Sequence, residues 1–206
     1  MLKKRIVIIG TGGHAVSCVD VIEATKKFVV VGVVSKEISQ SHFWSKFAYL
    51  GSDECLIDVV NTVSNAFIGI GQIKDSQLRT ELYCKLKEIG FQMPKIVSNH
   101  ALVSRSAKIG EGSIVMHGAK INAGAVIGNN CIINTGAIIE HGTQVGSNSH
   151  ISTGVILNGD VTVGENTFIG SNSVVREGVS IGDFALIGMG SQVRRDLPSR
   201  ETFLGH

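Results

Sequence analysis

His141 is the residue whose type and setting best suit proton transfer. It is the third residue of the hexapeptide Ile139-Glu140-His141-Gly142-Thr143-Gln144, a place expected to face outward in the repeat described below. Imidazole groups titrate near neutral pH, so an exposed histidine can act as general base for an attacking amine or hydroxyl group. Glu140 is a second catalytic candidate. Consecutive residues on a strand point to opposite faces, which leaves open the group that orients the His141 ring.

A glycine-rich turn near the N-terminus is the second feature with chemical potential. The run Gly10-Thr11-Gly12-Gly13-His14-Ala15 lies between a predicted strand and a predicted helix. Backbone N–H groups at a helix N-terminus suit a phosphate. The run fits a loose dinucleotide fingerprint, Gly-x-Gly-x-x-Ala. However, Ser35 and Lys36 stand where the fingerprint has an acidic residue, which argues against a dinucleotide.

The histidines, cysteines and carboxylates show no metal-site spacing. The four cysteines contain no Cys-x-x-Cys pair. We therefore expect no metal, reduced thiols and a cytoplasmic location. His117 is interpreted as a surface histidine.

The second half of the chain consists of sixteen consecutive hexapeptides without an insertion. In each unit the register position is a branched aliphatic residue, and a small or modest side chain follows four residues later. The register positions are Val103, Ile109, Val115, Ile121, Ile127, Ile133, Ile139, Val145, Ile151, Leu157, Val163, Ile169, Val175, Ile181, Ile187 and Val193. Three units make one triangular coil, so the run predicts a parallel β-solenoid of about five coils with the aliphatic residues inside.

The first half of the chain alternates apolar runs with helical patterns. We predict strands at Arg5–Gly10, Phe28–Val34 and Ala66–Gly71, one helix after Gly13 and another over Ser76–Ile89. Strands that are apolar on both faces and separated by helices indicate a small, Rossmann-like parallel α/β sheet. Residues 37–51 have no clear period and are predicted to form a loop. The expected domains are an α/β domain at 1–97 and a β-helix at 98–206.

Composition excludes two classes of partner. The net charge of +2 is too small to indicate nucleic acid or an anionic membrane. The longest apolar runs, such as Phe28–Val34, are far shorter than the ~20 residues of a membrane span. The N-terminus has no signal-like apolar region followed by a cleavage site. We therefore expect neither a nucleic-acid partner nor a membrane span.

The hexapeptide run and the Gly-x-Gly-Gly-His turn together resemble a family of left-handed parallel β-helix sugar acetyltransferases. These are the enzymes of the sialic-acid gene cluster and of the bacillosamine and perosamine pathways. The resemblance covers essentially the whole chain, and the segment from Asn134 to Asp160 is its most specific part. It implies acetyl-CoA as co-substrate, a sugar or sugar nucleotide as acceptor, and a homotrimer.

The resemblance also implies roles for single residues. His141 would be the catalytic base, although Gly142 stands where some relatives carry an acidic residue. His150 would donate a hydrogen bond to the thioester carbonyl, and Asn134 would lie near the acceptor sugar. Arg194 and Arg195 could meet the CoA phosphates. The pantetheine arm would bind backbone groups of Gly159, Ser171 and Met189, and a sugar-nucleotide pyrophosphate would bind at Gly10, Gly12, Gly13 and His14.

We therefore expect an acetyl-CoA-dependent enzyme that N-acetylates an amino sugar, nucleotide-linked, for surface polysaccharide or glycan biosynthesis. The acceptor would attack the thioester directly, because no serine or cysteine is paired with a base. One alternative is O-acetylation of sialic acid, which Ser35 favours slightly. Another is a non-catalytic partner that stabilises a sugar-pathway enzyme, and a carbonic anhydrase is a distant fourth.

Overall fold

The computed structural model describes residues 3–37 and 41–205. The chain divides into two compact units. The first comprises Met1–Gly71 and Gln77–Ile96, and the second comprises Gln72–Ser76 and Val97–His206.

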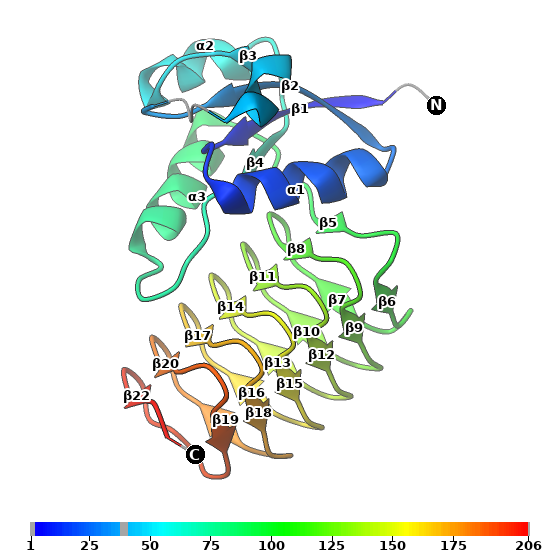
Figure 1. Ribbon diagram of the computed structural model, residues 1–206, viewed down its shortest axis with the longest axis vertical. Coiled ribbons are helices and arrows are strands. Elements are labelled where there is room, and N and C mark those ends of the chain that lie inside the picture. Colours follow the sequence, from blue (N-terminus) through cyan, green and yellow to red (C-terminus); the bar gives the residue numbers. More distant parts are fainter. Residues whose placement is uncertain (1–2, 38–40, 206) are drawn as a thin grey trace. The chain divides into compact units, whose positions relative to one another are not determined.

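The first unit contains the predicted parallel sheet (Figure 1). Its strands are arranged in the order β3-β2-β1-β4, and every pair is parallel. The strands are β1 (Lys4–Ile9), β2 (Phe28–Val34), β3 (Ala48–Tyr49) and β4 (Ala66–Ile68). The helices are α1 (Gly13–Ala24), α2 (Leu56–Val60) and α3 (Gln77–Ile89), with 3₁₀ helices η1 (His42–Lys46) and η2 (Asp53–Cys55).

The predicted loop at 37–51 contains two elements within residues 41–51. Within this stretch, η1 buries Trp44, and β3 adds a fourth strand beside β2. The prediction failed because a 3₁₀ helix and a two-residue strand are too short to give a hydrophobic period. Residues 38–40 lie outside the described part of the chain.

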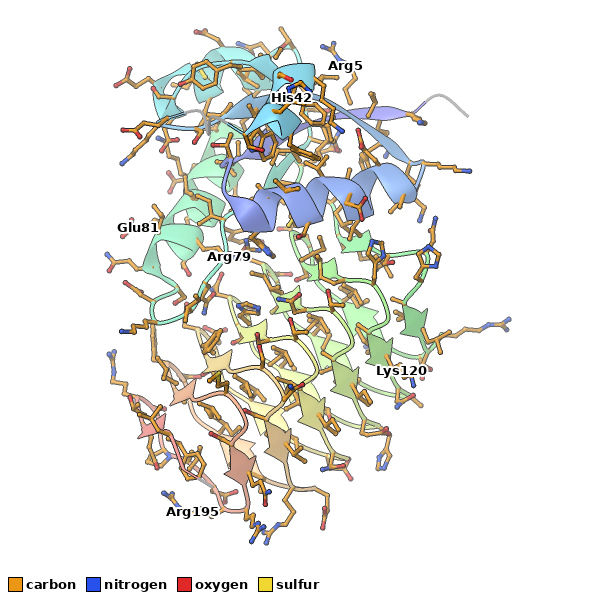
Figure 2. All side chains as sticks on the ribbon, viewed as in Figure 1. Arg5, His42, Arg79, Glu81, Lys120 and Arg195 are labelled. Atoms are coloured by element: carbon orange, nitrogen blue, oxygen red, sulfur yellow. The ribbon has the colours of Figure 1, made fainter. Side chains whose placement is uncertain are left out.

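The core of the first unit holds the carboxyl end of the sheet in place. Ile6, Val7, Ile8 and Ile9 are 0–1% exposed, as expected of a strand covered on both faces. Arg79 of α3 is also buried, and its Nη1 donates to the carbonyl oxygens of Ile68 and Ile70, each at 2.9 Å. Figure 2 labels Arg79 on α3. These bonds satisfy the carbonyl groups where β4 ends.

The second unit is a triangular parallel β-helix built from three sheets (Figure 1). One sheet contains β5 (Ile96–Val97), β8 (Ile114–Val115), β11 (Ile132–Ile133), β14 (His150–Ile151), β17 (Phe168–Ile169), β20 (Leu186–Ile187) and β22 (Thr202–Phe203). The next contains β6 (Leu102–Val103), β9 (Lys120–Ile121), β12 (Ile138–Ile139), β15 (Ile156–Leu157), β18 (Val174–Val175) and β21 (Gln192–Val193). The third contains β7 (Lys108–Ile109), β10 (Val126–Ile127), β13 (Gln144–Val145), β16 (Thr162–Val163) and β19 (Ser180–Ile181).

The hexapeptide register determines which side chains face the axis. Paired strands from β6 to β21 are 18 residues apart, so Ile139 lies between Ile121 and Leu157. These register residues belong to one continuous buried cluster, whereas Lys120, which precedes Ile121, is exposed (Figure 2). Most turns between strands use glycine or asparagine in the left-handed region, such as Gly142 at φ +69° and Asn172 at φ +58°, where bulky residues are strained. The repeat therefore determines which residues face the axis and which lie on the exposed corners.

Candidate active site

His141 lies on the corner that joins β12 to β13, and its side chain is exposed. The ring packs on Gly159, which occupies the same corner one coil later. A Cβ atom at Gly159 would lie 2.5 Å from His141 Cε1 and 2.7 Å from Nε2. The backbone of Gly159 is not in the left-handed region. The absence of a side chain at Gly159 therefore leaves room for the imidazole in this position.

The ring of His141 has no hydrogen bond or ion pair with any residue in the ranges 3–37 and 41–205, and the Glu140 carboxylate has none either. Glu140 is half-buried, and its backbone N–H donates to Leu157 O at 2.9 Å. On the other side of the histidine, the Asp160 N–H donates to His141 O at 2.9 Å. The predicted pair of Glu140 and His141 is adjacent in sequence but not bonded through its side chains.

His150 and Asn134, which were predicted to contact different substrates, bond to each other. His150 Nδ1 lies 2.6 Å from the backbone oxygen of Gln72, and a carbonyl oxygen can only accept. Nδ1 therefore carries the proton, and in the neutral ring Nε2 is an acceptor. Asn134 Nδ2 lies 3.1 Å from Nε2, while Asn134 Oδ1 accepts from Thr135 N at 2.8 Å. The four groups form one consistent chain of donors and acceptors.

This network changes the role expected for His150. The side chain is 7% exposed in β14, with its ring edge-on to Phe168 at 5.2 Å between centroids. In this tautomer Nε2 accepts from Asn134, whereas the family resemblance implies that His150 donates to the thioester carbonyl. Sequence alone could not reveal this, because Gln72 is 78 residues away from His150 along the chain.

The residues predicted to bind pantetheine lie on two different corners of the prism. Gly159 shares the corner of His141. Ser171 and Met189 lie on the corner that follows β17 and β20, which Asn134 also occupies after β11. Ser171 Oγ is 2.9 Å from Ser152 Oγ, and Met189 is 83% exposed. A single stack of coils therefore does not bring all of these residues together.

The glycine-rich turn lies at the carboxyl edge of the first unit's sheet. Gly10 has φ +99°, Gly12 is the N-cap of α1, and Gly13 and His14 begin that helix. A Cβ atom would meet nothing within 4 Å at Gly12 or Gly13, so the space over the helix N-terminus is open. His14 Nε2 lies 3.3 Å from the Cys18 thiol one turn later.

A pocket of about 190 Å³ opens at the same edge of the sheet. Its polar lining includes Ser35, Lys36 and Asp53, beside apolar groups from the ends of β1 and β2. Asp53 begins η2 and was missed as a site residue. The dinucleotide fingerprint has its acidic residue at the end of the second strand, whereas η2 brings a carboxylate to this edge from 18 residues further on. The run Gly51-Ser52-Asp53-Glu54 before α2 is the signal that could have identified it.

Four other polar residues have specific surroundings in the β-helix. His117, interpreted from the sequence as a surface histidine, is half-buried, and its Nδ1 lies 2.6 Å from Ser98 Oγ. Arg195, at the C-terminal end of the β-helix (Figure 2), is paired with Glu201 at 2.7 Å. Arg194 and Arg176 line a groove of about 380 Å³ that begins beside Asn158.

The residues in the described ranges form neither a candidate metal site nor a candidate membrane-spanning helix. No three histidine, cysteine or acidic side chains there are grouped closely enough to bind a metal ion. None of the helices formed by these residues has the length and apolar character needed to cross a membrane.

Comparison with family models identifies both halves of the chain. Residues 5–86 match the PglD N-terminal domain. Residues 106–141 match the bacterial transferase hexapeptide (six repeats), and residues 160–195 match the hexapeptide repeat of succinyl-transferase. The comparison with curated proteins returned no match.

Solved structures resemble the whole chain. Perosamine N-acetyltransferase from Caulobacter crescentus, solved with CoA and GDP-perosamine, is 34% identical with a TM-score of 0.86, covering 94% of this chain and 90% of that one. A variant of the same enzyme in which a histidine is replaced by asparagine gives a TM-score of 0.88 at the same identity and coverage. The acetyltransferase domain of PglB from Neisseria gonorrhoeae, solved with acetyl coenzyme A, is 25% identical with a TM-score of 0.85, covering 97% and 95%.

These likenesses extend through both units, from the α/β sheet to the last coils. The β-helix is thus the left-handed helix of the hexapeptide transferases. The chain belongs to the family of hexapeptide-repeat sugar N-acetyltransferases that carry a PglD N-terminal domain.

Proposed function

We propose that the protein transfers the acetyl group of acetyl-CoA to the amine of a nucleotide-linked amino sugar, with His141 as general base. The observation that carries this proposal is the exposed His141 ring, packed on a glycine whose absent side chain makes room for it. It is supported by 34% identity to a perosamine N-acetyltransferase that binds CoA and GDP-perosamine.

The proposed reaction needs only one base. The sugar amine attacks the thioester carbonyl carbon, and the carbon–sulfur bond breaks as the tetrahedral intermediate collapses. His141 accepts the proton that the attacking nitrogen loses, and the CoA sulfur leaves as a thiolate that takes up a proton. General base catalysis of this kind typically contributes 10²–10⁴-fold to the rate. The metal-free chemistry fits an acyl donor that is already activated.

A nucleotide-linked acceptor is favoured over a free sugar by the first unit. The open N-terminus of α1 offers backbone N–H groups to a pyrophosphate. The adjoining pocket offers apolar walls and the Asp53 carboxylate to a nucleoside. Asp53 thus supplies the acidic group whose absence after β2 had favoured a sialic-acid-type acceptor.

We propose a homotrimer as the active species. His141 and Gly159 occupy one corner of the prism, and Ser171 and Met189 occupy another. Residues on different corners of one prism can line a common groove only if a second prism packs alongside.

The four free cysteines support a reducing, cytoplasmic location.

The decisive experiment incubates purified protein and acetyl-CoA with a panel of acceptors and detects acetylated products by mass spectrometry. The panel contains GDP- and UDP-linked 4-amino sugars, free sialic acid and CMP-linked sialic acid. We expect acetylation of at least one nucleotide-linked amino sugar, on nitrogen. Acetylation of sialic acid alone would replace this proposal with O-acetylation. Absence of any product, together with no thermal shift by acetyl-CoA, would indicate a non-catalytic partner.

A further inference from the structure

A catalytic imidazole usually has a bonded partner, and none of the described residues provides one for the His141 ring. A base accepts a proton on one ring nitrogen, and a carboxylate or carbonyl group normally fixes the other nitrogen and stabilises the cation that forms. The described part of the chain provides His141 with no bonded acceptor in the resting arrangement. A nearby group must therefore stabilise the imidazolium during the reaction.

The carboxylate of Asp160 lies against Gly142, the residue that follows His141. Asp160 follows Gly159, on which the imidazole packs, and its N–H donates to His141 O. Its Oδ1 lies over the Cα atom of Gly142, so closely that a side chain at position 142 would overlap it. The carboxylate of Asp160 therefore occupies the space that a residue directly after His141 would otherwise fill.

The charge at Asp160 is not required by the turn that holds it. Asp160 has φ +58°, and the corresponding left-handed turn positions Asn130, Asn148, Asn166 and Asn172 have φ between +54° and +61°. Asparagine is thus sufficient for this backbone conformation. Asn148 and Asn166 bond to other side chains, whereas no residue in the described ranges donates to the Asp160 carboxylate. Asp160 is the one acidic residue among the described left-handed positions.

Resting on the proposed function, we propose that Asp160 is the positioning residue for His141. Its negative charge stabilises the imidazolium that forms when the sugar amine loses its proton. Glu140 is the other carboxylate near this corner. It directly precedes His141 after the end of β12, where its half-buried carboxylate has no bond to the His141 ring, and the corner one coil earlier, Asn122–Ala125, carries no charge. Gly142 and Gly159 then belong to one arrangement. Gly142 leaves space for the Asp160 carboxylate, and Gly159 leaves space for the His141 ring.

The test compares charge removal at two similar turns. Asp160→Asn keeps the side-chain shape and the left-handed preference but removes the charge. Asp183→Asn is the control, because the Asp183 carboxylate also lies over a glycine, Gly164, at a corner without a histidine, where it accepts from Glu165 N. With the acceptor that the panel identifies, we expect Asp160→Asn to lower kcat about 10-fold, short of the 10²–10⁴-fold expected for loss of the base. The KM for acetyl-CoA and the Tm should stay within error, and Asp183→Asn should match the unaltered protein.

Two further variants separate positioning from folding. In the His141→Ala background, Asp160→Asn should cause no additional loss, because residues that act as a unit are not additive. In the Asp160→Gly background, Gly142→Asp should raise kcat, because it returns a carboxylate to the same space from the other coil. An Asp160→Asn kcat within twofold of the unaltered protein, or an undiminished loss in the His141→Ala background, would overturn this assignment alone. Absence of acetyl transfer by the unaltered protein would overturn the proposed function with it.

Discussion

At the scale of single residues, the site depends on glycines as well as on the side chains that would do chemistry. His141 is exposed on its corner, as its place in the hexapeptide predicted. The packing of its ring on Gly159 was not predictable, because glycines recur at many corners and only the coil geometry shows which of them contacts a ring.

Substitution of Gly159 tests this packing. In Gly159→Ala the new Cβ would lie 2.5 Å from His141 Cε1, so the ring must turn aside while the coil stays intact. We expect kcat to fall by up to about 10²-fold, since small misplacements of reacting groups can cost that much, with little change in Tm. Steady-state kinetics and a thermal melt measure the two effects.

The matched control is Gly146→Ala, where the clash would be with backbone rather than a movable ring. Its Cβ would lie 2.6 Å from Glu165 N, and forced overpacking typically costs about 1–3 kcal/mol. That variant should lower Tm and leave the kcat of the folded fraction unchanged. A Gly159→Ala enzyme with full turnover would show that the ring position seen here is not needed.

The tautomer of His150 provides a second test at this scale. Because Gln72 O and Asn134 Nδ2 face its two nitrogens, the neutral ring should carry its proton on Nδ1. Long-range ¹H–¹⁵N spectra should show a protonated Nδ1 and an unprotonated Nε2 for the signal that disappears in His150→Asn. A proton on Nε2 would contradict the network and restore the donor role expected from sequence.

At the scale of secondary-structure elements, sequence predicted the repetitive parts better than the irregular ones. Every hexapeptide register position from Val103 to Val193 is found in a short strand at its predicted place. The strand Phe28–Val34 was predicted with its exact bounds. The element η1 and the strand β3 were missed because they gain their stability from contacts such as the burial of Trp44, not from a local pattern.

Helix α1 buries a thiol that should be chemically inert. Cys18 is 0% exposed, and burial raises the pKa of its thiol from 9.0 to about 12. Since the thiolate is the reactive form, iodoacetamide at pH 8 should modify exposed Cys84 and leave Cys18 intact until the protein is unfolded in urea. Peptide mass spectrometry distinguishes the two sites.

The raised pKa of Cys18 also predicts how the free energy of unfolding changes with pH. Cys18 ionises in the unfolded chain near pH 9 but in the folded chain only near pH 12. The folded state thus binds this proton more tightly, and the contribution to stability is present below pH 9 and decreases as the pH rises towards 12. Cys18→Ala should have a flatter stability profile over this range. Rapid alkylation of Cys18 at pH 8 in the folded protein would contradict the burial of this helix face.

At the scale of the whole molecule, the two-part sequence pattern is seen as two compact units. Sequence patterns could not show that residues Gln72–Ser76 group with the β-helix. These residues precede α3. Their contacts with the β-helix, such as the hydrogen bond from Ser76 Oγ to Asn166 Oδ1 at 2.9 Å, span 90 residues. Long-range contacts of this kind leave no trace in local periodicity.

Assembly is the prediction that belongs to the whole molecule. Sedimentation equilibrium should give about three times the chain mass of 21.9 kDa, because the residues expected to line the acetyl-CoA groove lie on different corners of one prism. A monomer with full turnover would show that one prism is sufficient and would remove the shared groove from the account.

The most direct test of the central claim is the turnover of His141→Ala. The variant should bind CoA as the unaltered protein does, measured by calorimetry, because CoA contacts are expected from backbone groups elsewhere on the coils. Its kcat for acetyl transfer, measured as release of the CoA thiol with the acceptor identified in the panel, should be 10²–10⁴-fold lower. Near-normal turnover with unchanged CoA binding would show that His141 is not the base.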